Sequence, residues 1–295
     1  MTDVVIAGIG QTEVGEHWEI SLRDLALDAI QAANNDSGGL KPQALFVGNM
    51  FAPNLSNQAH LGALIADYAG LTGIEAVTVE AAGASGGAAL RQGYLAIASG
   101  MVNVALVVGI EKFTDKIGSE VEEVISTTSD SDFEAVQGMT TTAQAALLMK
   151  RYIHEHNVPA NAFAGFALTA HANGIANKNA MFRKAIKAET YAKADMVSDP
   201  LNMFDVAPNA DGAAAIILTR RDLLPSDWQR PLVKIAGSAA SSDTLALHDR
   251  KDMLYFDTAQ ISAGKAMKQA GIVLDQVNFF EYHDCLLYTS PSPRD

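Results

Sequence analysis

A run of small residues that follows an apolar segment is the part of this sequence best suited to chemistry. Residues 79–90 read Val-Glu-Ala-Ala-Gly-Ala-Ser-Gly-Gly-Ala-Ala-Leu, which predicts a strand that turns sharply into a helix. A side chain at such a turn lies at the helix N-terminus, where backbone N–H groups and the helix dipole stabilise an anion such as a thiolate. The exposed position of the turn is Gly83, which cannot attack a substrate. The turn therefore has the form of a nucleophile site without a nucleophile.

Three other features could take part in chemistry. Ser85 is a possible substitute nucleophile, but it lies further along the helix and faces another direction, so helix capping is the expected role. His283 could be a buried histidine bonded to the backbone or an acid or oxyanion-stabilising group. His154 and His156 lie two positions apart on a predicted helix and so on different faces, which argues against a metal site.

Alternating strand and helix patterns surround the turn. Apolar runs predict strands at residues 4–10, 44–49, 76–80 and 104–109. Helical periodicity predicts helices from Ser21, over 57–68 and up to about Ser99. Asp24, three residues after Ser21, completes a helix-start signature. This alternation favours an α/β fold in which helices cover both faces of a sheet.

Two glycines at the end of the first apolar run invite comparison with a dinucleotide-binding turn. Gly8 and Gly10 have the spacing of that motif, but Glu13 stands where its third glycine would be and would repel a pyrophosphate. We expect a tight turn at these glycines and no dinucleotide.

The middle of the chain departs from the alternation, and its last part repeats it. Residues 113–205 predict an inserted domain, with an acidic stretch at 120–134 expected to be solvated and helices near 142–156 and 160–176. A strand at 212–218 resumes the sheet, so residues 1–112 and 206–230 are assigned to one half. Residues 231–284 then echo the start, with a strand at 233–237, a helix at 258–270 and a strand at 278–283, which indicates an incomplete second copy of the same unit.

Composition excludes several classes of protein. The chain has 295 residues, 48% hydrophobic and 19% charged, which is ordinary for a folded globular protein. A formal charge of −13 argues against binding to nucleic acid or an anionic membrane. The sequence shows neither a signal segment nor an apolar run of roughly 18 to 20 residues, so we expect a cytoplasmic protein.

The end of the sequence changes abruptly in character. Residues 285–295 resemble the translation of a sequencing-library adapter, so we expect a non-native tail and a truncated natural sequence that is readable to about Asp284. Whether Cys285, the single cysteine, is native stays open. One cysteine excludes an intramolecular disulfide and a multi-cysteine metal site.

Four segments carry a resemblance to a known family. Residues 79–86 resemble a Val-Glu-x-Ala-Cys-Ala-Ser-Gly loop with Gly83 in place of the cysteine, and residues 205–214 resemble an Asp-x-x-Pro-x-x-Asp-Gly-Ala-Ala segment. Residues 171–183 are similar to an insertion-domain signature, and residues 281–284 to the start of a His-Asp-Cys/Ala-Phe motif. These are motifs of the thiolase superfamily, and the pattern most resembles archaeal-type acetyl-CoA acetyltransferases and sterol-carrier-protein-x-type thiolases. The resemblance runs from residue 3 to residue 284.

The resemblance implies a duplicated, five-layered αβαβα fold that acts on acyl-CoA thioesters. In that family the loop cysteine forms an acyl-enzyme, a Gly-His-Pro histidine activates it, the His-Asp motif contributes to an oxyanion hole, and a second cysteine moves the α-proton. His283 is the one of these groups found here, because Gly83 replaces the first cysteine and the other two motifs would lie beyond residue 295. The same resemblance places Met139 at the acyl entrance and Ser85 beside the substrate.

The function implied is a thiolase-like acyltransferase that is inactive in this form for lack of the cysteine. Coenzyme A thioester is then a substrate, and no separate cofactor or metal is expected. Two alternatives stay open: a CoA-thioester retro-aldolase of the same fold, and a non-catalytic subunit that binds acyl-CoA or lipid. The resemblance also implies a homodimer and, as a possible partner, a small OB-fold protein.

Overall fold

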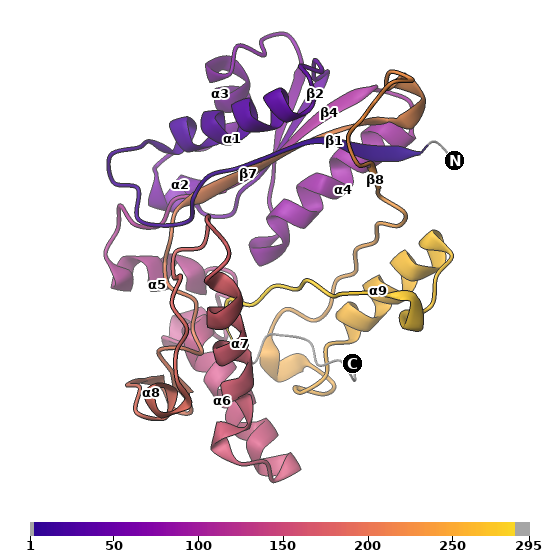
Figure 1. Ribbon diagram of the computed structural model, residues 1–295. Coiled ribbons are helices and arrows are strands. Elements are labelled where there is room, and N and C mark those ends of the chain that lie inside the picture. Colours follow the sequence, from indigo (N-terminus) through magenta and orange to yellow (C-terminus); the bar gives the residue numbers. More distant parts are fainter. Residues whose placement is uncertain (1–2, 287–295) are drawn as a thin grey trace. The chain divides into compact units, whose positions relative to one another are not determined.

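A six-stranded mixed sheet organises the first of two units in the computed structural model, which describes residues 3–286 (Figure 1). This unit comprises Met1–Lys116, Ala210–Ala240 and Gly264–Val273. The strand order is β3-β2-β4-β7-β1-β8, with β2 parallel to β3 and β4, and the remaining neighbours antiparallel. The strands are β1 (Val4–Gln11), β2 (Ala44–Gly48), β3 (Glu75–Val79), β4 (Val104–Glu111), β7 (Gly212–Arg220) and β8 (Val233–Lys234).

Helices cover both faces of this sheet, so the expected α/β architecture is confirmed (Figure 1). Leu106 and Val108 of β4 join the core that contains α1 (Leu22–Asp36) and α3 (Leu61–Tyr68). Their neighbours Ala105 and Val107 join the core that contains α4 (Ser85–Ala98). Alternate residues of one strand therefore pack against opposite layers, as the period of a strand requires.

The helix α1 begins after Ser21, as the sequence predicts. The helix expected at 57–68 is shorter than predicted at its N-terminal end. The Ser21 side chain accepts a bond from the Asp24 backbone and the Asp24 side chain accepts one from the Ser21 backbone, which is a complete capping box. The second helix begins only at Leu61, because Asn57 and His60 adopt left-handed backbone angles that interrupt a helix. A separate short helix, α2 (Ala52–Leu55), precedes them.

The expectation of a tight turn at the first glycine pair is wrong. Gly8 and Gly10 lie inside β1, where α1 crosses the strand closely. A Cβ added at Gly8 would lie 2.3 Å from the carbonyl oxygen of Ala33, and one at Gly10 would lie 2.1 Å from that of Ala29. These glycines therefore permit close packing of helix on strand.

The second unit comprises Ile117–Asn209, Ser241–Ala263 and Leu274–Asp295. Its helices are α5 (Gly118–Ser126), α6 (Thr141–His156), α7 (Ala164–Gly174) and α8 (Ala188–Ala192), and β5 (Met196–Ser198) pairs with β6 (Leu201–Asn202). Helices were expected at the places of α6 and α7. Glu134 departs from the expected solvated surface: it is buried and accepts bonds from the backbone N–H groups of Asp130 and Leu247.

The repeated half is only partly formed. The helix expected at 258–270 is present as α9 (Asp257–Ala270), but residues 278–283 form no strand, so that prediction is wrong. A strand is stable only when a neighbour satisfies its backbone N–H and C=O groups, and the described residues provide no such neighbour at this segment. The first strand of the repeat is the short β8, which adds to the first sheet beside β1. Residues 287–295 of the expected tail lie outside the described residues.

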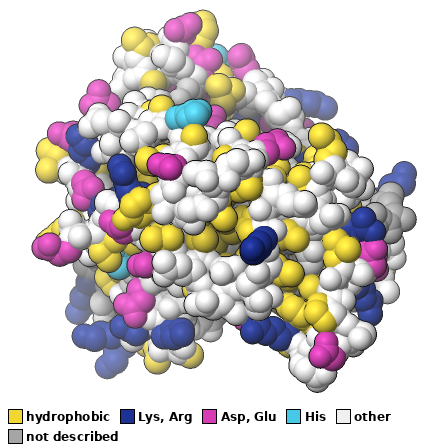
Figure 2. Space-filling view, turned by 90° about the horizontal axis from the view of Figure 1, so that it is seen from above, with side chains coloured by type: hydrophobic (Ala, Val, Ile, Leu, Met, Phe, Trp, Pro, Cys, Tyr) yellow, Lys and Arg dark blue, Asp and Glu magenta, His cyan; other side chains and the backbone are white. Residues whose placement is uncertain are grey.

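The surface carries charges of both signs. Figure 2 shows acidic and basic side chains interspersed over the face that it displays, without a continuous basic area. Within residues 3–286, none of the helices combines the length and the apolar character that crossing a bilayer requires.

The contact between α1 and β1 generates a prediction about stability. Gly10→Ala should lower the free energy of unfolding by about 2 kcal/mol, because the new methyl group forces backbone atoms apart. Gly109→Ala, in β4, is the matched control, since a Cβ there would meet nothing within 4 Å. Urea denaturation of both variants tests this, and equal midpoints would contradict the packing role of Gly10.

Candidate functional site

The turn at residues 80–84 joins the edge strand to the first turn of a long helix, as the sequence predicts. β3 ends at Val79, Ala82–Ala84 form a 3-10 turn, and α4 begins at Ser85. Gly83 is exposed within this turn, and Ala82 before it has a left-handed φ of 47°. The N-cap residue of α4 is Ala84, which makes no side-chain hydrogen bond to the helix. An anion at position 83 would therefore lie at a helix N-terminus that no side chain caps.

Ser85 stabilises the turn itself. Its buried hydroxyl accepts a bond from the Ala81 N–H at 2.9 Å and donates one to the Ala82 carbonyl at 2.7 Å. The expectation that Ser85 caps α4 is therefore wrong, since its hydroxyl bonds backward to the turn and not forward to the helix. Contact of Ser85 with a substrate stays a prediction.

Glycines flank this turn, and within it the Glu80 carboxylate accepts a bond from the Ala82 N–H at 2.5 Å. A Cβ at Gly48, the last residue of β2, would lie 2.7 Å from the Ser85 carbonyl oxygen and 2.8 Å from the Gly86 Cα. The end of β2 therefore packs directly against the backbone at the start of α4. In contrast, a Cβ at Gly86, Gly87 or Gly109 would meet nothing within 4 Å. A side chain could therefore be added at each of these three positions without a close contact.

Two polar side chains, Asn49 and Glu111, lie at the ends of β2 and β4, close in sequence to the contact between Gly48 and α4. Asn49 is 3% exposed; its amide nitrogen donates to the Ile110 carbonyl at 2.8 Å and its amide oxygen accepts from the Ala52 N–H at 2.9 Å. The Glu111 carboxyl accepts from the Met50 N–H at 2.5 Å. Burial raises the pKa of Glu111 to about 7, against the lowering effect of bonds from the Met50 and Phe51 backbone and the Asn49 side chain.

A buried ion pair joins the loops at the same end of the strands, after β4 and before β7. Asp211 is fully buried and accepts bonds from the backbone N–H groups of His17, Phe113 and Thr114, from the Thr114 hydroxyl and from Lys112 Nζ. Burial opposes ionisation, yet these bonds keep the pKa of Asp211 below its ordinary value. Lys112, 4% exposed, also donates to the His17 carbonyl and pairs with Asp115 at 2.9 Å. We interpret this ion pair as structural, because the polar atoms of Lys112 and Asp211 bond to groups of the surrounding loops.

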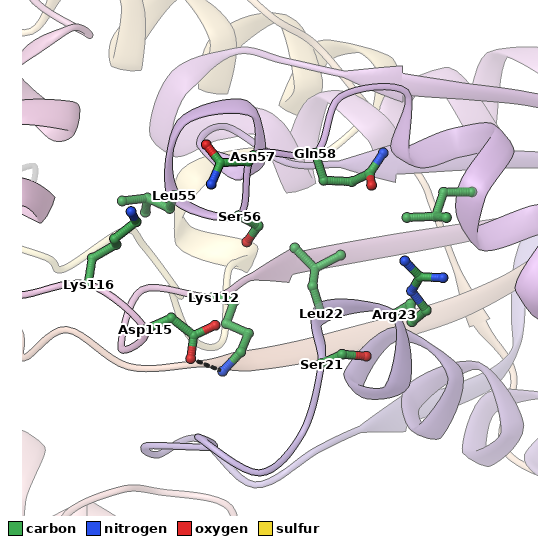
Figure 3. A pocket seen from close by; sticks show the side chains of 11 residues that line it. Ser21, Leu22, Arg23, Leu55, Ser56, Asn57, Gln58, Lys112, Asp115 and Lys116 are labelled. Carbon is green, nitrogen blue, oxygen red and sulfur yellow. Dashed lines mark ion pairs between the residues drawn. The ribbon is translucent and has the colours of Figure 1, made fainter.

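A pocket of about 390 Å³ lies in the same unit and does not include the turn. Figure 3 shows it between the start of α1, the loop after α2 and the loop after β4, with the Lys112–Asp115 ion pair at one side. Polar side chains form most of its lining: Ser21, Arg23, Ser56, Asn57, Gln58, Lys112, Asp115 and Lys116. Its apolar Leu22 belongs to the core on the α1 face, whereas the turn begins the helix on the other face.

The remaining predicted site residues lie in the second unit. Met139 is half-buried between the end of a 3-10 turn at Gly138 and Thr140, whose side chain caps α6. His283 is exposed in a segment without regular structure. Gly83 and Ser85 share one turn of the first unit. The roles of Met139 and His283 stay predictions.

Comparison with known proteins decides the family. Residues 4–222 match the family described as the thiolase N-terminal domain. This chain belongs to the thiolase family. An acetyl-CoA acetyltransferase of Methanothermobacter thermautotrophicus is 38% identical over 287 residues, which are 97% of this chain and 74% of that protein.

Solved structures share the fold of this chain. A human mitochondrial 3-ketoacyl-CoA thiolase in complex with CoA superposes with a TM-score of 0.77 at 18% identity, over 97% of this chain and 80% of that one. An Ltp2-ChsH2(DUF35) aldolase gives a TM-score of 0.75 at 20% identity, over 92% and 70% of the two chains. At these identities the likeness shows the thiolase fold alone.

Sequence reasoning missed the buried contacts of Asn49 and Glu111. Their partners are backbone groups of a neighbouring strand end and loop, and neither the pairing of β2 with β4 nor its register can be read from one sequence. The available signal was the pair Glu111-Lys112, two adjacent charged residues at the end of an apolar run. A charge at that place must be solvated or find a partner.

The raised pKa of Glu111 predicts a specific pH dependence. The folded state holds this proton up to about pH 7 and the unfolded chain releases it near the ordinary value of 4.5, so stability falls as pH rises between these two values. Between pH 4.5 and pH 7 this effect lowers the free energy of unfolding by roughly 3 kcal/mol in total. Glu111→Gln should abolish this pH-dependent loss. Urea denaturation of both proteins from pH 4 to pH 8 measures the difference. A constant difference across this range would contradict the raised pKa.

Proposed function

We propose that this protein is a thiolase-like acyltransferase, of the acetyl-CoA acetyltransferase type, whose substrates are acyl-CoA thioesters and which is inactive in this form because Gly83 occupies the nucleophile position. The observation that carries the proposal is the strand–turn–helix at residues 75–98, which presents Gly83 at an uncapped helix N-terminus, where the resemblance puts the family's nucleophile. The 38% identity to an archaeal acetyl-CoA acetyltransferase supports the substrate class. In this proposal the N-terminal half comprises residues 1–112 and 206–230. The inserted domain comprises residues 113–205, and the start of the C-terminal half comprises residues 231–284.

The turn can supply part of the required chemistry. Thioester exchange needs a thiolate, and the dipole at the start of α4, which has no side-chain cap, favours a negative charge there. With Gly83 in the turn, no acyl-cysteine forms at this position. In the proposal, His283 contributes to oxyanion stabilisation, and Ser85 and Met139 line the route of the acyl group. Coenzyme A enters as part of the substrate and no metal takes part.

Restoring the thiol tests the proposal. Gly83→Cys should acquire an acetyl group from acetyl-CoA at residue 83, whereas the unaltered protein should acquire none in the turn. Gly87→Cys is the matched control, because it adds a thiol to the same helix at a position with open space but beyond the turn. Peptide mass spectrometry identifies the acylated residue. An adduct in the turn of the unaltered protein, or equal acylation of the Gly83→Cys and Gly87→Cys variants, would refute the assignment.

The missing thiol favours one alternative enzyme. A retro-aldolase that cleaves a carbon–carbon bond of a β-hydroxyacyl-CoA needs a base and an oxyanion site but no acyl-enzyme, so glycine at position 83 would be functional. One aldolase shares the fold. Cleavage of a β-hydroxyacyl-CoA by the unaltered protein, with no gain of acyl transfer in Gly83→Cys, would favour it. Binding of acyl-CoA with neither reaction would favour a non-catalytic acyl-CoA- or lipid-binding subunit.

The proposal includes a homodimer in the cytoplasm and, as a possible second partner, a small OB-fold protein. β3 supports self-association because it is the edge strand of the sheet, pairs with β2 alone among the described residues, and leaves Val77 40% exposed. The solved aldolase includes a DUF35 component, which supports a partner protein in this proposal.

Self-association through this edge has a direct test. Val77→Lys should shift the protein from dimer to monomer in sedimentation velocity, since a charge on an edge strand opposes pairing with a second strand. Val273→Lys is the control, because that residue is exposed at 62% outside the sheet. A dimer that persists in Val77→Lys would exclude this edge as the interface.

A further inference from the structure

The turn that carries Gly83 is held at both ends by Gly48, the last residue of β2, and by Asn49, which follows it. Before the turn, the Asn49 N–H donates to the Val79 carbonyl at 3.2 Å. After the turn, Gly48 lies against the Ser85 carbonyl and the Gly86 Cα, so closely that no Cβ would fit. The position of Gly48 and Asn49 therefore determines where the turn begins and where α4 starts.

The end of β2 is in turn held by the end of β4. Gly48 pairs with Gly109 in the parallel register of the two strands, so Ile110 and Glu111 follow directly beyond the last rung. The Asn49 side chain donates to the Ile110 carbonyl, and its oxygen accepts from Ala52. Glu111 accepts from the N–H groups of Met50 and Phe51. These bonds hold the four residues after Gly48 in one place.

We infer that Asn49 and Glu111 are positioning residues that set the geometry of the Gly83 turn. No ion pair involving Glu111 occurs among the described residues, so hydrogen bonds alone offset the cost of burying its carboxyl. Neutral apolar residues would avoid that cost, but they could not accept the backbone N–H groups of the loop after β2. Because this loop continues from the residues that contact the turn, a change at either side chain should move position 83 relative to the start of α4.

The inference rests on the proposed function in one respect: it takes the Gly83 turn as the place where the acyl group would bind. Its geometry can be measured without turnover, through the reactivity of a thiol placed at position 83. A thiol that is well placed at the helix N-terminus has a pKa below the ordinary value of about 8.5 and is alkylated faster at neutral pH. Displacement from the helix axis removes this effect, because the helix dipole acts over about one turn.

The experiment measures iodoacetamide alkylation of Gly83→Cys as a function of pH, alone and combined with Asn49→Ala or Glu111→Ala. Peptide mapping separates the thiol introduced at position 83 from the existing Cys285. We expect a lowered thiol pKa in Gly83→Cys and, in both double variants, a thiol pKa near 8.5 with roughly tenfold slower alkylation at pH 7. Thr219→Val is the matched control, because it removes a buried hydroxyl that bonds to the Asn103 carbonyl at the other end of β4. It should destabilise the fold and leave the thiol pKa unchanged.

Each outcome decides the inference. An unchanged thiol pKa in the folded double variants, or an equal change with Thr219→Val, would overturn it. If the alanine variants fail to fold, Glu111→Gln with Gly83→Cys replaces them: its amide oxygen can accept one of the two N–H bonds, so an intermediate thiol pKa supports the inference and an unchanged pKa overturns it. A shifted thiol pKa without any acyl transfer from acetyl-CoA would support the positioning role and count against the proposed function.

Discussion

Hydrogen bonds to the buried Asp211 carboxylate are the interaction on which the loops at the ends of β4 and β7 depend. Asp211 accepts bonds from His17 before α1 and from Lys112, Phe113 and Thr114 after β4, while it stands at the start of β7 itself. Three chain segments far apart in sequence thus converge on one charge. An ionised group without water must be fully hydrogen-bonded, and this requirement leaves the loops little freedom.

Close backbone contacts complete this arrangement. Glycines in β1 allow α1 to lie directly on the strand, and Gly48 allows the start of α4 to lie on β2. With the ends of β2 and β4 joined through Asn49 and Glu111, the turn before α4 rests on backbone and buried polar groups. The turn that contains Gly83 is therefore held by contacts that do not involve residue 83 itself.

Local patterns predicted much of the fold. The capping box at Ser21, the strand–turn–helix around Gly83 and the helices over α6 and α9 depend on residues close in sequence, and the structure has them. The errors arose where distant contacts decide. Gly8 and Gly10 were expected in a turn, but they are required by the approach of α1. Residues 278–283 have the composition of a strand, but among the described residues they have no neighbour to pair with.

The sequence by itself determined the family, the α/β class and the absence of a thiol at position 83, because each of these is written in residue identity and short-range order. Only the tertiary structure decided what holds that position. Asn49, Glu111 and Asp211 act through backbone groups of other strands and loops, and such pairings exist only once the sheet order and register are formed. Burial then converts ordinary polar residues into fixed supports, since an unpaired polar group in the interior costs free energy.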